Sequence, residues 1–271
     1  MTKPSAKKAI TSILIVFIEL EEPLARLSPQ RLADVRGNPD LFAYKYKVGD
    51  LDFSSFMLHP WTTNEVLRPL VTSKPRLRIL ELGSGNGSNG RTLCRLIQSY
   101  SDVHLHLIHL DLFEDNLAEA SERNHAFAKT HKDFSFECIQ TDLRSPENHN
   151  KLIKLLGQTM DIAFSIKFFH NTPIKISRTT AKLLGMLIPD SGIFILQCYG
   201  SPSIKDELTN ALKRARGKGY PNSISVDRFL AKLFLKTNGL KQIYRTINNG
   251  TGDREYDHFH QRRFDYFFEK Q

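Results

Sequence analysis

The chain has 271 residues, of which 40% are hydrophobic and 25% charged, and its formal net charge is +9. These values are ordinary for a globular domain with a full core, and they exclude a disordered, collagen-like or disulfide-rich chain. Lys and Arg exceed Asp and Glu mainly in the C-terminal quarter, which favours an anionic substrate or partner there. The three cysteines Cys94, Cys138 and Cys198 are far apart and form no C-x-x-C motif. We therefore expect buried thiols and a cytoplasmic protein.

Residues 1–60 show no clear alternation of strand and helix patterns. The basic start and the apolar run at residues 9–20 resemble parts of a signal peptide, but no A-x-A cleavage site follows. The run is also too short to span a bilayer, which takes about 20 apolar residues, so we expect no membrane insertion. Ser28 and Pro29 favour a helix start, and Gly37 favours its end. We predict a mainly helical cap over residues 1–74.

From residue 75 onward, strand-like and helix-like patterns alternate regularly, which predicts a second unit over residues 75–271. Apolar runs and alternating patterns predict strands, while apolar residues at helical spacing predict helices. The expected strands are residues 78–82, 103–110, 134–142, 160–166, 193–198, 240–247 and 262–269. The expected helices are residues 91–100, 116–128, 146–156, 174–187 and 225–238. The pattern predicts an α/β fold with a doubly wound, mostly parallel seven-stranded sheet and a C-terminal antiparallel strand pair.

The stretch RILELGSGNGSNGRTL, residues 78–93, matches two different cofactor motifs. The segment from Gly85 to Gly90 has the dinucleotide spacing G-x-G-x-x-G, whereas the segment from Glu81 to Gly87 has the spacing E-x-G-x-G-x-G. The dinucleotide motif needs its first glycine at the end of the strand. The expected strand ends at Leu82, so the second interpretation fits, and the acid of Glu81 would repel a pyrophosphate. A carboxylate there can instead accept hydrogen bonds from an ammonium group, directly or through water.

Over residues 76–271 the sequence resembles the class I S-adenosylmethionine-dependent methyltransferases, and in particular their small-molecule branch. The resemblance rests on Glu81 with the three glycines, on Asp111 after the second strand, and on Asp142 and Leu143 after the third. In that family these positions hold the methionine end, the ribose hydroxyls and the adenine of S-adenosylmethionine. The cofactor-binding residues that the resemblance implies are Glu81, Gly83, Ser84, Gly85, Gly87, Asp111, Leu112, Asp142, Leu143 and Ser165.

Asp111 and Asp142 also have simpler interpretations. Asp111 could cap the following helix, and an aspartate such as Asp142 is common in turns after strands. His104 and His106 lie two residues apart on one strand, which is compatible with metal binding. Because no third ligand is visible, we expect no metal site.

The resemblance implies methyl transfer to an oxygen or nitrogen of a small molecule. His170, after the fourth strand, is the candidate general base, although a structural role is an alternative. A substrate-side insert is expected over residues 201–224, with a basic cluster of Lys213, Arg214, Arg216 and Lys218. With the aromatic residues Tyr44, Tyr46, Phe53, Phe56 and Trp61 it could form a lid.

Three other functions stay open at this point. An RNA methyltransferase would suit the basic C-terminal quarter, but the sequence shows no RNA-binding module, so a nucleic-acid partner is less favoured. A nicotinamide-dependent oxidoreductase would need the other motif register. A catalytically silent cofactor-binding protein could keep the same fold. The oligomeric state cannot be inferred from the sequence.

Overall fold

The computed structural model describes residues 67–271 apart from residues 144, 167, 170–173, 201–227 and 249–261. The expected helix near residues 28–37, the aromatic lid residues, the insert with its basic cluster, and His170 lie outside the described residues. The described helices are α4 (Arg68–Thr72), α5 (Ser88–Gln98), α6 (Glu114–Ala128), α7 (Pro146–Leu156), α8 (Ile174–Leu187) and α10 (Arg228–Thr237). The strands are β1 (Arg76–Leu82), β2 (His104–Asp111), β3 (Phe134–Gln140), β4 (Ile162–Ile166), β5 (Ile193–Gly200), β6 (Leu240–Asn248) and β7 (Arg262–Lys270).

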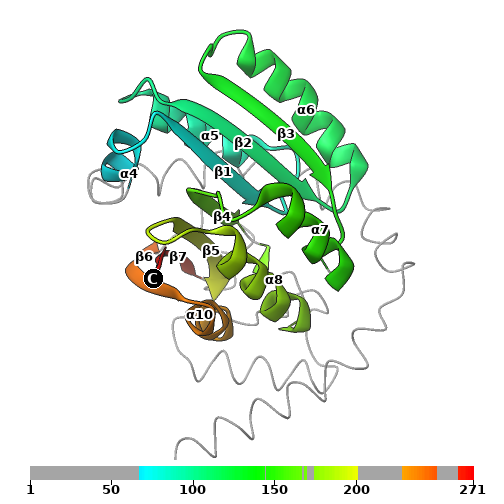
Figure 1. Cartoon of the computed structure of the whole chain (residues 1–271), viewed down its shortest axis with the longest axis vertical. Helices are drawn as coiled ribbons and strands as arrows, with labels where there is room; N and C mark the ends of the chain where they lie inside the picture. The colour runs from blue at the N-terminus through cyan, green and yellow to red at the C-terminus, as the bar shows by residue number, and fades with distance from the viewer. Residues whose placement is uncertain (1–66, 144, 167, 170–173, 201–227, 249–261) are drawn as a thin grey trace, which may run out of the picture.

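The seven strands form one sheet in the order β3-β2-β1-β4-β5-β7-β6. The pairs among β1 to β5 are parallel, whereas β7 pairs antiparallel with both β5 and β6. This arrangement confirms the predicted fold class of a doubly wound, mostly parallel sheet with an antiparallel end (Figure 1). The strand order reverses between β1 and β4, and the carboxyl edge of the sheet at this point is where ligands of open α/β sheets bind.

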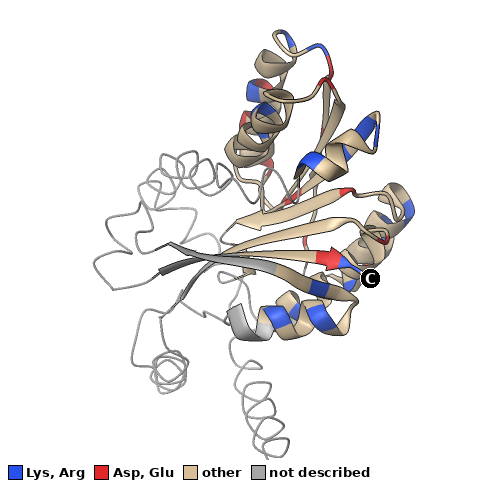
Figure 2. Ribbon diagram, turned by 90° about the vertical axis from the view of Figure 1, so that its left-hand side faces the viewer, with Lys and Arg blue, Asp and Glu red and all other residues tan. Residues whose placement is uncertain are grey.

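Two apolar clusters cover the two faces of the sheet, as a doubly wound fold requires. One cluster joins alternate strand residues to α7, α8 and α10, with Leu184, Leu187 and Leu235 completely buried. The other joins the opposite strand residues to α4, α5 and α6. Leu67 and Val71 of the α4 segment belong to this second cluster, so residues just before β1 pack on the sheet. Figure 2 shows that Lys, Arg, Asp and Glu lie mainly on the helices and loops around the strands.

Element boundaries differ from the sequence expectation where backbone geometry, rather than apolar pattern, sets them. Helix α5 begins at Ser88, three residues before the expected start, because Gly87 takes a left-handed conformation with a φ of 72° and ends the loop there. Strand β2 extends to Asp111, and β3 ends at Gln140. The helix expected over residues 225–238 is described from Arg228 to Thr237. None of the described helices combines the length and apolarity needed to cross a lipid bilayer.

The cysteine prediction is confirmed for one of the three residues. Cys94 is a free, fully buried thiol, and burial raises its pKa above the ordinary value. Cys138 is free but only half-buried, and burial also raises its pKa. The side chain of Cys198 lies outside the described residues. Since only a thiolate reacts readily, the burial of Cys94 makes it an inert structural thiol.

The contact between α8 and α10 gives a test of the packing on one face. A Cβ atom on Gly185 would lie 2.6 Å from the backbone oxygen of Asn238, next to the end of α10. We expect Gly185→Ala to lower the free energy of unfolding by about 1–3 kcal/mol, as overpacking of a core does. Met186→Ala is the control, because Met186 is 45% exposed on the same helix and should change stability by less than about 0.5 kcal/mol. Urea denaturation of both variants measures this, and equal stabilities would contradict the described α8–α10 packing.

Candidate functional site

A glycine loop, residues 83–87, joins the end of β1 to the start of α5. Gly83, Gly85 and Gly87 all have positive φ angles, between 53° and 72°, which residues with a Cβ rarely adopt. Gly83 is exposed and Gly85 half-buried, whereas Ser84 and Asn86 between them are buried. The alternation turns the glycine backbone toward the surface and the side chains inward. The loop therefore brings glycine backbone and the start of α5 to a place that a ligand can approach closely.

Asp111, at the end of β2, fixes the glycine loop. Its carboxylate accepts one hydrogen bond from the backbone N–H of Gly85 at 2.8 Å and another from that of Phe113 at 2.9 Å. The side-chain amide of Asn116 donates a third at 3.2 Å. The backbone N–H of Ser84 also donates to the carbonyl of Leu110 at 3.0 Å. Asp111 thus orders both loops at this edge, and a carboxylate can accept further donors beside those it already holds.

Arg91 holds the other side of the loop. Its side chain is buried in the first turns of α5, and its guanidinium donates to the carbonyl of Asn86 at 3.1 Å. The backbone N–H of Ser88 donates to the side-chain oxygen of Asn86 at 3.2 Å, which shapes the turn into the helix. The sequence interpretation did not select Arg91 as a site residue. Its position, three residues after the start of the helix, indicates a contact with the loop only once the start of the helix is known.

Glu81 lies beneath the loop, as the last residue but one of β1, and is only 2% exposed. Its Oε2 atom lies 2.8 Å from Nδ1 of His109 on β2, which is completely buried. This oxygen therefore faces the protein interior, toward α5 and α6. Of the two expected modes for Glu81, a contact with a ligand through water suits this burial better than a direct one.

The third and fourth strands bring the remaining predicted residues to the same edge. Leu143 is buried, and its carbonyl accepts a hydrogen bond from His149 on α7 at 2.8 Å. Asp142 is half-buried, and its carbonyl accepts from the Asn148 amide at 3.0 Å. The carbonyl of Leu112 accepts from the amide of Gln140 at 3.2 Å.

Ser165, near the end of β4, is completely buried beside Leu82 of β1. Its hydroxyl has no hydrogen-bond partner among the described residues. After β4, Phe168 packs over the glycine loop, since a Cβ on Gly83 would lie 2.7 Å from its ring. Phe168 was not among the predicted binding residues, and an aromatic residue after a strand gives no sequence signal for such a contact. The sheet thus brings the described candidates of all four strand ends to one edge.

The histidines that suggested a metal site have another partner. His104 Nε2 and His106 Nδ1 lie 3.1 Å and 2.9 Å from the hydroxyl of Ser135 on β3. Within the described part of the chain, no group of three His, Cys, Asp or Glu side chains has an arrangement that could hold a metal ion.

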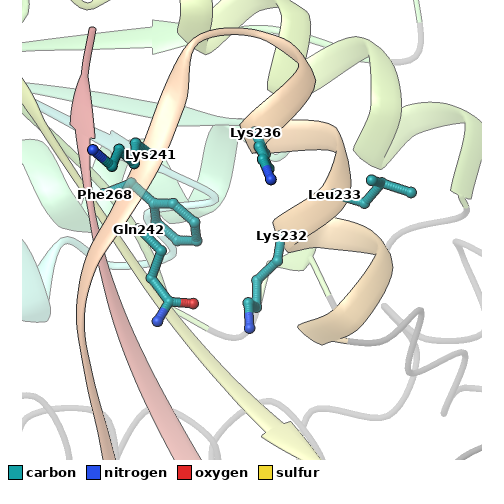
Figure 3. Close-up of a pocket in the computed structure, with 6 residues that line it drawn as sticks. All are labelled: Lys232, Leu233, Lys236, Lys241, Gln242 and Phe268. Carbon is teal, nitrogen blue, oxygen red and sulfur yellow. The ribbon is translucent and has the colours of Figure 1, made fainter.

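The described surface has two hollows, and Arg91, which also bonds to the glycine loop, lines one of them. One, of about 330 Å³, is shown in Figure 3, and its lining residues are Lys232, Leu233, Lys236, Lys241, Gln242 and Phe268. It lies at the start of β6, which adjoins the start of β5 through β7 and therefore belongs to the amino edge of the sheet. The other, of about 470 Å³, lies between α5 and α6 and includes Arg91, Arg95 and Arg123. Apart from the phenyl ring, the lining side chains in Figure 3 are partly or fully exposed, so solvent screens their charges.

Comparison with known proteins places the fold. No protein-family model matches the sequence, and no curated protein matches it either. Among solved structures, the chain is similar to a candidate sarcosine dimethylglycine methyltransferase from Galdieria sulphuraria, with 13% identity, 82% of this chain and 86% of that chain covered, and a TM-score of 0.53. It is similar to an S-adenosylmethionine-dependent methyltransferase from Methanosarcina mazei, with 12% identity, coverages of 74% and 97%, and a TM-score of 0.52.

A third similar structure is the cyclopropane synthase MmaA2 from Mycobacterium tuberculosis, with 10% identity, coverages of 77% and 84%, and a TM-score of 0.51. The fold is therefore that of the class I S-adenosylmethionine-dependent methyltransferases, as the sequence resemblance implied. Because MmaA2 is named as a cyclopropane synthase, the fold alone does not determine the reaction.

The buried carboxyl of Glu81 gives a pH-dependent test. Desolvation raises its pKa above the ordinary value of 4.5, and the contact with His109 and the charge of Arg91 oppose this rise without cancelling it. The folded protein then binds more protons than the unfolded chain, so the contribution of Glu81 to stability falls as pH rises from about 4.5 through its folded pKa. We expect the wild-type free energy of unfolding, minus that of Glu81→Gln, to decrease over this range and then level off.

Urea denaturation of both proteins from pH 4 to 8 measures this difference. The subtraction cancels the titration of the other carboxylates, which both proteins share. A difference that stays constant or grows with pH would show that the folded state does not raise the pKa of Glu81.

Proposed function

We propose that this protein binds S-adenosylmethionine at the carboxyl edge of β1 to β4 and transfers its methyl group to an oxygen or nitrogen of a small molecule. The observation that carries the proposal is the hydrogen bond from Gly85 to the carboxylate of Asp111. It joins a loop of three positive-φ glycines to the acid of the next strand, at the point where the strand order reverses. Ligands of open α/β sheets bind at such a point.

The proposed contacts follow from the positions of these groups. The exposed backbone of Gly83 and the half-buried backbone of Gly85 would accept the close approach of the methionine part, and Asp111 would accept the two ribose hydroxyls. Asp142 would accept the exocyclic amine of the adenine, and the apolar side chains of Leu112 and Leu143 would lie against its ring. Phe168 would close the loop from the β4 side. The bound cofactor would supply the activated methyl group, so the protein has to hold and align the nucleophile beside it.

The motif register supports this cofactor over a nicotinamide dinucleotide. Gly83 follows the last residue of β1 directly, as the E-x-G-x-G-x-G interpretation requires. The dinucleotide interpretation would begin two residues later, at Gly85, after the loop has already turned. The buried acid Glu81 beneath the loop would also repel a pyrophosphate, whereas it would attract a ligand with an ammonium and a sulfonium group.

The finer assignments belong to the same proposal. His170 is the candidate general base, because β4 delivers the segment after it to the edge where the loop lies. Residues 1–74 and 201–224 would form the substrate side, and the excess of Lys and Arg in the C-terminal quarter favours an anionic substrate. A cytoplasmic location agrees with the free thiols of Cys94 and Cys138.

Ligand-dependent stability tests the cofactor. We expect S-adenosylhomocysteine to raise the melting temperature, because a ligand that binds only the folded state at 100 times its Kd adds about 2.7 kcal/mol of stability. NADH at the same concentration should leave the melting temperature unchanged. A shift with NADH and none with S-adenosylhomocysteine or S-adenosylmethionine would refute the proposal.

A matched pair of glycine variants tests the place of binding. Gly85 and Gly157 have similar positive φ angles of 53° and 62°, and Gly157 lies at the end of α7. Replacing either with Val should cost at least the roughly 1–2 kcal/mol of a left-handed residue with a Cβ. Only Gly85→Val should also abolish binding of S-adenosylhomocysteine in calorimetry, because its side chain would occupy the ligand's approach to the backbone. Equal affinity in the two variants would remove the loop from the binding site.

A further inference from the structure

A fully buried histidine connects the acid beneath the glycine loop to α6. His109 is 0% exposed, and its Nδ1 atom lies 2.8 Å from Oε2 of Glu81. Its Nε2 atom lies 2.7 Å from the side-chain nitrogen of Asn124, which is also 0% exposed. The three side chains come from β1, β2 and α6, and they form a polar row inside the apolar face that α5 covers. We call them the Glu81–His109–Asn124 row.

The hydrogen-bond partner on α6 determines which ring nitrogen of His109 carries the proton. The amide nitrogen of Asn124 can only donate, so Nε2 of His109 has to accept. The imidazole then carries its proton on Nδ1 and directs it toward Oε2 of Glu81, 2.8 Å away. In this tautomer the ring presents an N–H, rather than a lone pair, to the carboxyl group of Glu81. Arg91 on α5 and Asp111 on β2 also act on Glu81, and their charges shift its pKa in opposite directions.

The start of α5 rests directly on this row. A Cβ on Gly87 would lie 2.8 Å from Cε1 of His109. A Cβ on Gly90 would lie 2.7 Å from Oε2 of Glu81 and 3.0 Å from the same imidazole carbon. The backbone of the first turn therefore touches the edge of the ring. The imidazole sets how close the helix start, and the loop before it, can come to the sheet.

From these contacts we infer that His109 is a positioning residue for the glycine loop and acts on it through Glu81. The row fixes the orientation of the Glu81 carboxylate and the distance of the first turn of α5 from the sheet. Both determine where the backbone of the glycine loop meets the ligand. The ligand part of this inference rests on the proposed function, whereas the effect on the loop does not.

Two amide variants separate the two ends of the ring. The side-chain nitrogen of an asparagine can take the place of Nδ1, whereas a glutamine reaches the place of Nε2. His109→Asn should therefore keep the hydrogen bond to Glu81, and His109→Gln should lose it. Both variants bury one uncharged amide, so they form a matched pair for stability. His106→Gln is the control on the same strand, because His106 is half-buried on the opposite face and bonds to Ser135.

Calorimetry with S-adenosylhomocysteine reads the effect on the ligand. We expect His109→Gln to weaken binding about tenfold, and His109→Asn to stay within about threefold of wild type, because a hydrogen bond to a charged group is being lost or kept. His106→Gln should bind as wild type does. Glu81→Gln should weaken binding as well, and adding His109→Gln to it should weaken binding by less than about twofold more. Equal binding by His109→Asn and His109→Gln, or full additivity with Glu81→Gln, would overturn the inference.

Hydrogen exchange of the ligand-free proteins measures how well the loop itself is ordered. The amides of residues 83–90 should exchange about tenfold faster in His109→Gln than in wild type, and His109→Asn should restore slow exchange. Loop exchange that is the same in both variants would overturn the inference even if the protein binds the ligand. Wild-type protein that shows slow loop exchange but binds no S-adenosylhomocysteine would refute the proposed function and leave the positioning role of His109 standing.

Discussion

The hydrogen bond from the N–H of Gly85 to the Asp111 carboxylate is the constraint on which the candidate site depends. It ties the loop after β1 to the end of β2, two segments that are separated by a whole helix in the sequence. The same carboxylate accepts hydrogen bonds from Phe113 and Asn116. It therefore fixes the start of α6 as well as the loop before α5. One buried acid thereby orients two helix starts around one point, and any ligand at that point meets both.

Beneath this surface arrangement lies a second layer of polar groups that never reaches the solvent. A fold that needs only apolar packing would place a small or apolar residue at the position of His109, because an unpaired polar group there is costly. The chain instead pairs His109 at both ring nitrogens and accommodates its volume with glycines at positions 87 and 90. The polar partners of His109 and the glycines beside it thus together allow this side chain to be buried at this position.

The sequence predicted the strands and the motif register well, because both depend on local patterns. The buried runs of β1 and β4 and the alternation in β2 identify strands without knowledge of their neighbours, and the acid before Gly83 identifies the loop. The contacts of His109 could not be predicted in the same way. Its partners Glu81 and Asn124 lie on other elements, and their meeting depends on the register of β2 against β1 and on the rotation of α6. The start of α5 was missed for a similar reason, since a left-handed glycine, not an apolar residue, determines it.

The position of β7 between β5 and β6 has a consequence for how the protein is made. Strand β7 is synthesised after both of its neighbours, yet it pairs with each of them along its length. The parallel part of the sheet can assemble while the ribosome is still translating, but β5 and β6 stay without their common partner until residues 262–270 emerge. Such late, non-local pairing slows folding and leaves strand edges open for intermolecular association. Once β7 is in place, β6 is the edge strand of the sheet, and its bulge between Gln242 and Tyr244 and the exposed Lys241 disfavour pairing with another chain.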